Sequence, residues 1–262
     1  MKLLVSICSY AEHESVYLNK VIESYYEITK ADPSIEIDIA LCVNYNYLSY
    51  LVYTDRIKFH IIRPKYTELA FIYSTNQFII DNVKNYDLFI HTDSDVVVTY
   101  QNIIYYLQNM DFLKEKIPNS YMNYIPGFLV YELDSNNNKR IISMNTDYPP
   151  LGDEYLEIAR RRYVVPHNLH SNMNMVDSER LLNAISSGRF NSDPTIYKGM
   201  YYIREYCMTN IYFDCGMKKV VAPLVPGYLV HHTPNKYITL SDKQITNIEL
   251  ENSTNYTDAE TT

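Results

Sequence analysis

Two carboxylates, Asp93 and Asp95, follow directly after a short apolar run of strand type that ends at Ile90. Side chains two positions apart on a strand point to one face, so both carboxylates can reach a single point, with their backbones about 6–7 Å apart. Such hard oxygen ligands suit Mg²⁺ or Mn²⁺, which share their coordination shell with substrate phosphates. Asp-x-Asp pairs also arise by chance in solvated loops, so the metal-site hypothesis depends on the surrounding pattern.

Alternating strands and helices are expected to position this pair. The expected strands are Leu3–Cys8, Ile35–Val43, Ile57–Ile62 and Asp87–Ile90, and the expected helices are Ser15–Ile28 and Leu69–Val83. This alternation predicts an α/β fold with a Rossmann-like, mostly parallel central sheet and helices on both faces. Ligands of such sheets bind beyond the carboxyl ends of the strands. Asp93 and Asp95 should therefore share one rim with the segment Ser9–Glu12.

The rest of the chain is less regular, which predicts a smaller antiparallel region. We expect helices and strands over Thr99–Leu113, Phe128–Leu133, Arg140–Met144, Met173–Val176, Ser178–Ile185, Tyr201–Phe213, Val220–Val225 and Tyr228–His232. Residues 145–172 show little periodicity, and long irregular stretches inside compact domains are often functional loops. We find no internal repeat and no domain linker.

Composition excludes several classes of protein. The chain has 262 residues, 47% hydrophobic and 21% charged, as in ordinary globular proteins. Its net charge of −8 argues against a nucleic-acid partner, which requires a basic surface. The four cysteines lack Cys-x-x-Cys spacing and are expected to be free thiols of a reducing compartment. The apolar start is too short for a secretory signal, and no run reaches the ~18 apolar residues of a membrane span, so we predict a cytoplasmic protein.

Four pieces in this order resemble the GT-A family of nucleotide-sugar glycosyltransferases, chiefly its inverting type. The first is Leu4–Glu12, similar to the opening strand and loop that hold the nucleotide base. The second is Asn76, which stands 17 residues before Asp93, close to the family's spacing between an Arg-Asn helix motif and its Asp-x-Asp. The third is the pair Asp93 and Asp95 itself.

The fourth piece lies near the end of the chain. Arg204-Glu205 is followed by Gly216 after 11 residues and by His231 after another 15, similar to the family's Glu-Asp pair, glycine and closing-strand histidine. Together the four pieces cover most of residues 1–238. The resemblance implies a single GT-A domain over residues 1–240, with a nucleotide-binding half (1–98) and an acceptor-binding half (99–240), followed by a polar tail (241–262).

The resemblance also implies a set of donor-binding residues. They are Ser9, Tyr10, Glu12, Asn44, Arg63, Asn76, Asp93 and Ser94. Tyr10 is a candidate for stacking on the base. Asn44 stands where the family usually has an aspartate, the family's Asn-x-Gly signature is absent, and Arg204 replaces one acid of the Glu-Asp pair.

The cofactor implied is Mn²⁺ or Mg²⁺. Asp95 is the first choice for direct coordination, and the resemblance places Asp93 near the ribose and the metal. A neutral imidazole can complete the shell of Mn²⁺. His231 fits the family spacing better than His232, but adjacent residues on a strand face opposite ways, so only one of them can be the ligand.

Transfer to a hydroxyl with inversion requires a general base within hydrogen-bond reach of that hydroxyl. Glu205 is the preferred base, Asp177 is the next candidate, and Asp153 and Glu154 are in reserve. A retaining enzyme would need no such base. The run Arg160–Arg162 offers a cation for the diphosphate, although such runs are more often solvated helix faces.

The preferred hypothesis is a metal-dependent glycosyltransferase, of hexosyl type, that uses a UDP-sugar or a GDP-sugar and a carbohydrate, glycan or protein-linked hydroxyl acceptor. A nucleotidyltransferase is an alternative, but such enzymes open with a Gly-rich, basic phosphate loop that Ser9–Glu14 lacks. A catalytically inactive carbohydrate-binding protein on the same fold is the other.

Overall fold

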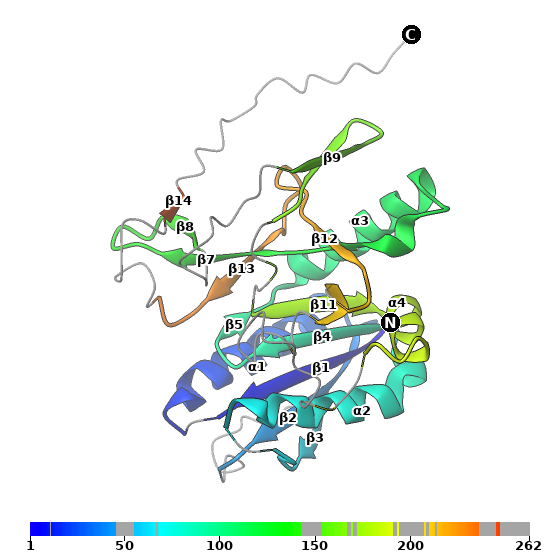
Figure 1. The fold of residues 1–262 in the computed structure, drawn as a ribbon. Helices are drawn as coiled ribbons and strands as arrows, with labels where there is room; N and C mark the ends of the chain where they lie inside the picture. Colours follow the sequence, from blue (N-terminus) through cyan, green and yellow to red (C-terminus); the bar gives the residue numbers. More distant parts are fainter. Residues whose placement is uncertain are drawn as a thin grey trace.

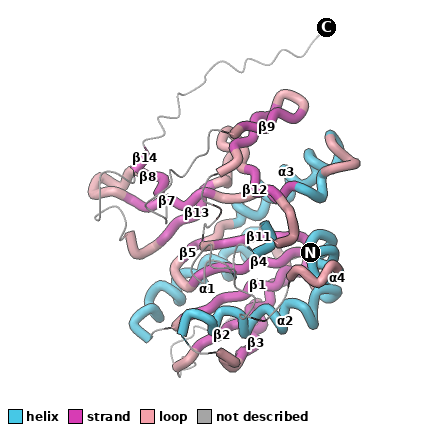
Figure 2. Tube along the Cα trace, in the orientation of Figure 1, coloured by secondary structure: helices cyan, strands magenta, loops and turns pink. Residues whose placement is uncertain are grey.

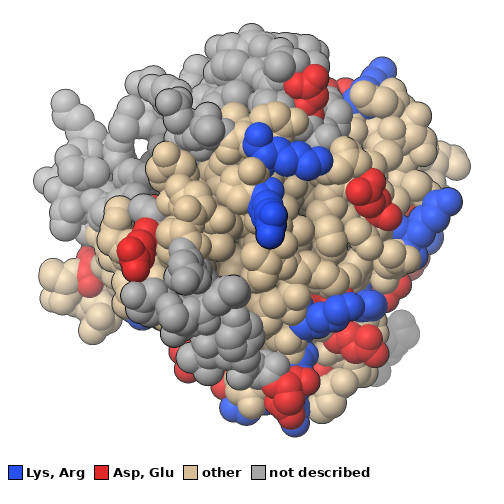
Figure 3. Space-filling model, turned by 90° about the horizontal axis from the view of Figure 1, so that it is seen from below, with Lys and Arg blue, Asp and Glu red and all other residues tan. Residues whose placement is uncertain are grey.

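The computed structural model describes most of the chain. The described residues are 1–10, 12–45, 55–66, 68–142, 154–166, 169, 172–190, 193, 207, 210–212, 214–235 and 245–246. None of their helices is long and apolar enough to cross a membrane. On the face seen from below, acidic and basic side chains are interspersed, so the residues drawn in colour form no patch of one sign there (Figure 3).

A five-stranded sheet forms the centre of the molecule, with strand order β11-β4-β1-β2-β3. Its strands are β1 (Lys2–Ser9), β2 (Glu36–Val43), β3 (Ile57–Ile62), β4 (Leu88–Asp93) and β11 (Met173–Asp177). The first four are parallel and β11 is antiparallel to β4. The apolar runs of β1 and β4 are buried along almost their whole length, as expected for strands covered on both faces.

Helices cover both faces of this sheet (Figures 1 and 2). They are α1 (Ser15–Ala31), α2 (Ser74–Asn82), α3 (Tyr100–Lys116) and α4 (Ser178–Ser186), with 3-10 turns η1 (Glu12–Glu14), η2 (Glu68–Tyr73), η3 (Val83–Asn85) and η4 (Tyr121–Asn123). The helices α1 and α3 contact each other. Each helix presents an apolar stripe to one continuous core that includes residues of both halves of the chain.

A second, mixed sheet continues from the first, with strand order β14-β8-β7-β13-β5. Its strands are β5 (Val96–Val97), β7 (Leu129–Leu133), β8 (Lys139–Ile142), β13 (Leu229–His232) and β14 (Ile245–Thr246). Two small ladders pair β6 (Tyr124–Pro126) with β12 (Lys218–Val220), and β9 (Tyr155–Ile158) with β10 (Arg161–Val164). Because β5 starts one residue after Asp95, the segment Asp93–Asp95 connects the two sheets.

The predicted α/β class, with a mostly parallel sheet, is confirmed, and the expected elements of the first half are present. The helix expected over Leu69–Val83 is divided into η2, α2 and η3. Part of the stretch expected to be irregular forms the hairpin of β9 and β10. The helix expected over Tyr201–Phe213 lies mostly outside the described residues, and the proposed division at residue 98 stays a prediction.

The basic run Arg160–Arg162 lies in this hairpin and not on a helix face. The guanidinium carbon of Arg161 lies 3.8 Å from the ring centre of Phe112, and that of Arg162 lies 3.6 Å from the ring centre of Tyr155. A guanidinium on an aromatic face is a stabilising cation–π contact. These contacts give Arg161 and Arg162 a packing role at the hairpin.

Candidate functional site

The strand order places a hollow beside Asp93 and Asp95. The chain runs outward from β1 to β2 and β3 on one side, whereas β4 lies on the other side of β1. Ligands of open α/β sheets bind where the strand order reverses in this way. A hollow of about 420 Å³, counting the solvent at its mouth, lies here and is lined by Cys8, Tyr10, Glu14, Phe71, Ile72, Asp93, Ser94 and Asp95. The predicted common rim of the two segments is therefore present.

The Asp-x-Asp segment forms one wall of the hollow. Asp93 is the last residue of β4 and is 7% exposed, and its backbone N–H donates to the carbonyl oxygen of Asn172 at 2.9 Å. Asp95 is more open, with 19% of its side chain exposed. Thr233 ties the backbone of Asp95 to the end of β13, since its N–H and its hydroxyl both donate to the Asp95 carbonyl.

His232 joins this segment from far along the chain. It pairs with Val96 across β13 and β5, which brings its Nε2 to 3.3 Å from Oδ2 of Asp95. Its Nδ1 lies 2.6 Å from Oε1 of Glu132 on β7. Burial opposes protonation of the ring, but the neighbouring carboxylates of Asp95 and Glu132 outweigh burial and raise the pKa of His232 above its usual value.

His231, which the family spacing favoured, faces away from the carboxylates. Its ring stacks on the ring of Tyr131, with the ring centres 4.9 Å apart and the planes 11° from parallel. Its Nε2 lies 3.4 Å from Oδ1 of Asn235. Since neighbouring strand residues point to opposite faces, the structure selects His232 as the histidine that lies beside Asp95.

The residues predicted to hold the nucleotide lie at the ends of β1 and β2. Ser9 is buried and its hydroxyl is 2.9 Å from that of Tyr45. Tyr10 is 47% exposed at the mouth of the hollow, with its ring edge-on to Phe71. Glu12 and Asn44 are exposed at the same edge of the sheet. An exposed aromatic ring at this position can stack on a planar ligand.

The other predicted donor residues are more dispersed. Asn76, on α2, is fully buried and its amide donates to the Cys207 sulfur at 3.4 Å, so its contact is internal. Arg63 follows β3, the edge strand three places from β4. Three strand spacings amount to about 14 Å, so Arg63 is remote from the carboxylates. The Ser94 hydroxyl lies 3.4 Å from a carboxylate oxygen of Glu14 in the hollow.

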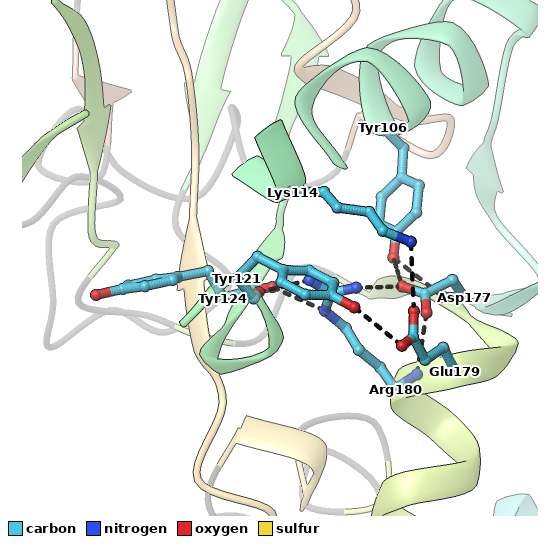
Figure 4. Close-up of polar contacts among 7 residues, drawn as sticks. All are labelled: Tyr106, Lys114, Tyr121, Tyr124, Asp177, Glu179 and Arg180. Carbon is cyan, nitrogen blue, oxygen red and sulfur yellow. Dashed lines mark hydrogen bonds and ion pairs between the residues drawn. The ribbon is translucent and has the colours of Figure 1, made fainter. Parts of the chain in front are cut away.

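Asp177, a candidate base, lies at the opposite end of the sheet. It pairs with Leu88, the first residue of β4, because β11 runs antiparallel. The Asp177 carboxylate caps α4 by accepting the Arg180 N–H, and it also accepts hydrogen bonds from the Arg180 guanidinium and the Tyr106 hydroxyl (Figure 4). Leu88 and Asp93 are about 16 Å apart along β4, which removes Asp177 as a base for this site.

Several other candidates fall outside the described residues or away from the hollow. Glu205, Arg204 and Asp153 belong to the part of the chain that is not described. Glu154 is described, and its carboxylate forms an exposed ion pair with Lys218 at 2.8 Å.

Sequence reasoning missed Glu132 and the hollow's other wall. Glu132 is fully buried on β7, two positions after the buried Val130 and so on the same face of the strand. A carboxylate at an inward position of an expected strand requires a polar partner, and that rule was the available signal. Phe71 and Ile72 come from η2, which the sequence pattern merged into a longer helix.

The carboxylates and His232 fit a small divalent cation. No group of three His, Cys, Asp or Glu side chains within the described ranges converges as a complete metal site. Mg²⁺ usually takes only one or two carboxylates from the protein and keeps waters and substrate phosphates in its shell, and Mn²⁺ also accepts imidazole nitrogen. Asp95 with His232, and Asp93 beside them, are donors of this kind.

Comparison with known proteins gives likenesses of fold only. No protein-family model and no curated protein sequence matches the chain. A fragment of S. aureus TarS, residues 1–349, is 9% identical with a TM-score of 0.43, covering 89% of this chain and 60% of that one. The same fragment in complex with UDP-GlcNAc is 8% identical with a TM-score of 0.46, covering 89% and 58%.

Two further solved structures align over most of their length. The CMP:2-keto-3-deoxy-manno-octonic acid synthetase complexed with CTP is 10% identical with a TM-score of 0.45, covering 92% of this chain and 97% of that one. The 4-diphosphocytidyl-2C-methyl-D-erythritol synthase of Anaerococcus prevotii is 10% identical with a TM-score of 0.42, covering 89% and 90%. The chain therefore spans about 60% of the TarS fragment and almost all of the two synthases.

Proposed function

We propose that this protein is a metal-dependent glycosyltransferase that takes a nucleoside-diphosphate sugar, a UDP-sugar in the first instance and a GDP-sugar as the other choice. One observation carries the proposal. Asp93 and Asp95 lie at the carboxyl end of β4, at the point where the strand order reverses, and Asp95 meets His232 from far downstream in the chain. A site of this position and chemistry suits a cation together with a diphosphate.

The roles follow from the positions of the side chains. Asp95 and His232 would hold Mn²⁺ or Mg²⁺, and Asp93, which lines the same hollow as Asp95, would lie near the ribose and the metal. The bound cation would supply Lewis-acid stabilisation of the departing diphosphate. Tyr10 would stack on the base, while Ser9, Glu12 and Asn44 line the edge where the ribose and base would lie.

We infer a hydroxyl acceptor on a carbohydrate, a glycan or a protein-linked sugar, with inversion at the transferred carbon. Inversion requires a base, and Glu205 remains the predicted one. Asp177 lies at the far end of β4 and is too remote for that role.

A donor panel tests the proposal. The full-length chain is incubated with UDP-, GDP- and TDP-sugars, UDP-GlcNAc included, with Mn²⁺ or with EDTA, and release of nucleoside diphosphate is measured. We expect release from one nucleotide class that requires the metal and that is lost in Asp95→Asn. Release that is equal with EDTA would contradict the proposed metal dependence.

A nucleotidyltransferase is the second candidate, because paired carboxylates at this edge can also hold a metal–triphosphate. Ser9–Glu14 contains no Gly, Lys or Arg for a phosphate loop, which favours the first proposal. Exchange of labelled pyrophosphate into CTP and the other nucleoside triphosphates would establish this alternative. No activity in either assay, together with binding of sugars, would indicate an inactive carbohydrate-binding protein.

A further inference from the structure

We propose that Glu132 is a positioning residue that orients His232 toward the bound cation, so that the metal site includes a buried carboxylate that no sequence pattern identified. The inference rests on the proposed metal site and adds the residue behind its histidine. It concerns Glu132, His232 and Asp95, which belong to β7, β13 and the segment between β4 and β5.

The three side chains form a line. Glu132 Oε1 lies 2.6 Å from Nδ1 of His232, and Nε2 on the far side of the same ring lies 3.3 Å from Oδ2 of Asp95. Parallel pairing of β13 with β7 aligns Val230 with Val130 and His231 with Tyr131, so the next residues, His232 and Glu132, are neighbours on one face. Backbone register therefore places the His232 ring between the Glu132 and Asp95 carboxylates.

Burial of these polar side chains lowers the stability of the fold unless each of them is hydrogen-bonded or binds a ligand. Glu132 and His232 are both fully buried, whereas Asp95 keeps 19% of its side chain exposed at the hollow. A carboxylate removed from water is destabilising unless it accepts strong hydrogen bonds. Asp95 is therefore the solvent-accessible end of this line, and Glu132 is its fully buried end.

The protonation of the His232 ring explains the role of Glu132. An ionised carboxylate only accepts hydrogen bonds, so the 2.6 Å contact assigns the proton of a neutral His232 to Nδ1. The lone pair of Nε2 is then directed at the Asp95 side, where the cation would lie. Histidine ligands of metals commonly donate their second N–H to a carboxylate in this way, and loss of that partner typically costs about 10–100-fold in metal affinity.

The same chain contains a matched pair for comparison. His60 Nε2 lies 3.1 Å from Oδ2 of Asp38, and Asp38 also accepts a hydrogen bond from Tyr86 at 2.7 Å. Asp38 pairs with Leu4, four residues before Cys8 on β1, or about 13 Å from the hollow. Asp38→Asn therefore disturbs a carboxylate–histidine contact of similar length without touching the proposed site.

The experiment measures metal affinity of the folded protein. Binding of Mn²⁺ to the full-length chain in the presence of UDP is followed by the electron paramagnetic resonance signal of free Mn²⁺. We expect Glu132→Gln to weaken Mn²⁺ about 10–100-fold and Glu132→Leu to weaken it at least as much, because leucine also removes the acceptor. Asp38→Asn should stay within about twofold of the wild type, since it is remote. Circular dichroism confirms that each variant is folded.

A second measurement needs no variant of Glu132. Long-range ¹⁵N–¹H spectra of the wild-type histidines, with Mg²⁺ and UDP, report which ring nitrogen of His232 carries the proton, and His232→Gln assigns the signal. A proton on Nδ1 with Nε2 bare supports the inference. A proton on Nε2 overturns it, even if both Glu132 variants fail to fold.

The outcomes separate this inference from the proposed function. Wild-type protein that binds neither Mn²⁺ nor Mg²⁺ with UDP overturns both. Wild-type binding that Glu132→Gln and Glu132→Leu retain within about twofold overturns the positioning role alone and leaves the glycosyltransferase proposal standing.

Discussion

The two ends of strand β4 carry charged clusters that differ in how their charges are balanced. At the amino end, Asp177 lies against the guanidinium of Arg180, which also donates to the carbonyls of Tyr121 and Tyr124 (Figure 4). At the carboxyl end, the carboxylates of Asp95 and Glu132 flank a single imidazole. The first cluster contains its own counter-charge, and the second has a surplus of negative charge even when its imidazole is protonated.

This difference indicates which cluster serves the fold and which one serves a ligand. Arg180, on α4, is fully buried and its hydrogen bonds reach β11, η4 and β6, so it ties α4 to these elements. The carboxyl-end cluster instead opens into a hollow through Asp93 and Asp95. A buried surplus of negative charge is tolerated where a cation binds.

Removal of the amino-end cation should have the largest effect. Arg180→Met removes the guanidinium that balances the charge of Asp177 and donates to two carbonyl groups, which should lower the free energy of unfolding by about 3–5 kcal/mol. Urea titration measures the change, and Lys218→Met, which breaks an exposed pair with Glu154, is the control at under about 1 kcal/mol. Weakened Mn²⁺ binding in folded Arg180→Met would contradict the assignment of this cluster to the fold.

The carboxyl-end cluster should respond in the opposite way. Asp95→Asn removes a proposed ligand and one of the like charges, so it should lower Mn²⁺ affinity by at least about a hundredfold, more than loss of an outer partner. Its free energy of unfolding without metal should change little, since the relief of repulsion between Asp95 and Glu132 offsets the lost contact with His232. Calorimetric titration with Mn²⁺ and UDP, beside urea unfolding in EDTA, measures both. A large loss of stability without metal would make Asp95 a fold residue.

Lys219 extends the comparison to a buried cation. Burial lowers its pKa from 10.5 to about 7, and its ammonium donates to the carbonyl of Leu169. Between pH 7 and 10.5, Lys219 is protonated in the unfolded chain but neutral in the folded protein. The free energy of unfolding should therefore rise with pH, by up to about 1.4 kcal/mol per pH unit. Lys219→Met should remove that rise and increase stability at pH 7.

The measurement is urea unfolding between pH 7 and 9.5. The range stops there because buried tyrosines, whose pKa values are raised by burial, oppose the trend at higher pH. A wild-type profile that runs parallel to that of Lys219→Met would show that Lys219 remains charged in the folded protein.

The smallest effect is expected at His231. His231→Phe keeps a ring against Tyr131 and should change Mn²⁺ affinity by less than about twofold, whereas His232→Phe should cost about tenfold or more. Parallel Mn²⁺ titrations of the two variants, followed by the same resonance signal, measure this difference. The reverse order would mean that the register of β13 against β5 is wrong.

Local sequence accounts for much of this protein. Buried apolar runs and helical spacing predicted β1 to β4 and the helices between them, and Asp93 and Asp95 were found because they directly follow such a run. The alternation also predicted that Ser9–Glu12 and Asp93–Asp95 share one rim, as the lining of the hollow confirms. These features depend on a few neighbouring residues, whose pattern is visible in the chain itself.

Which of the candidate residues meet at the hollow depends on the direction and register of strands that are distant in the sequence. Asp177 follows a strand just as Asp93 does, but β11 runs antiparallel, so its carboxyl end points away from the hollow. Whether His231 or His232 meets Asp95 is decided by the pairing of β13 with β5, and Glu132 enters only through β7. The sequence by itself determined which residue types stand at strand ends. Only the tertiary structure determined which of them meet, because hydrogen-bonded pairing across the sheets sets direction and face for each strand.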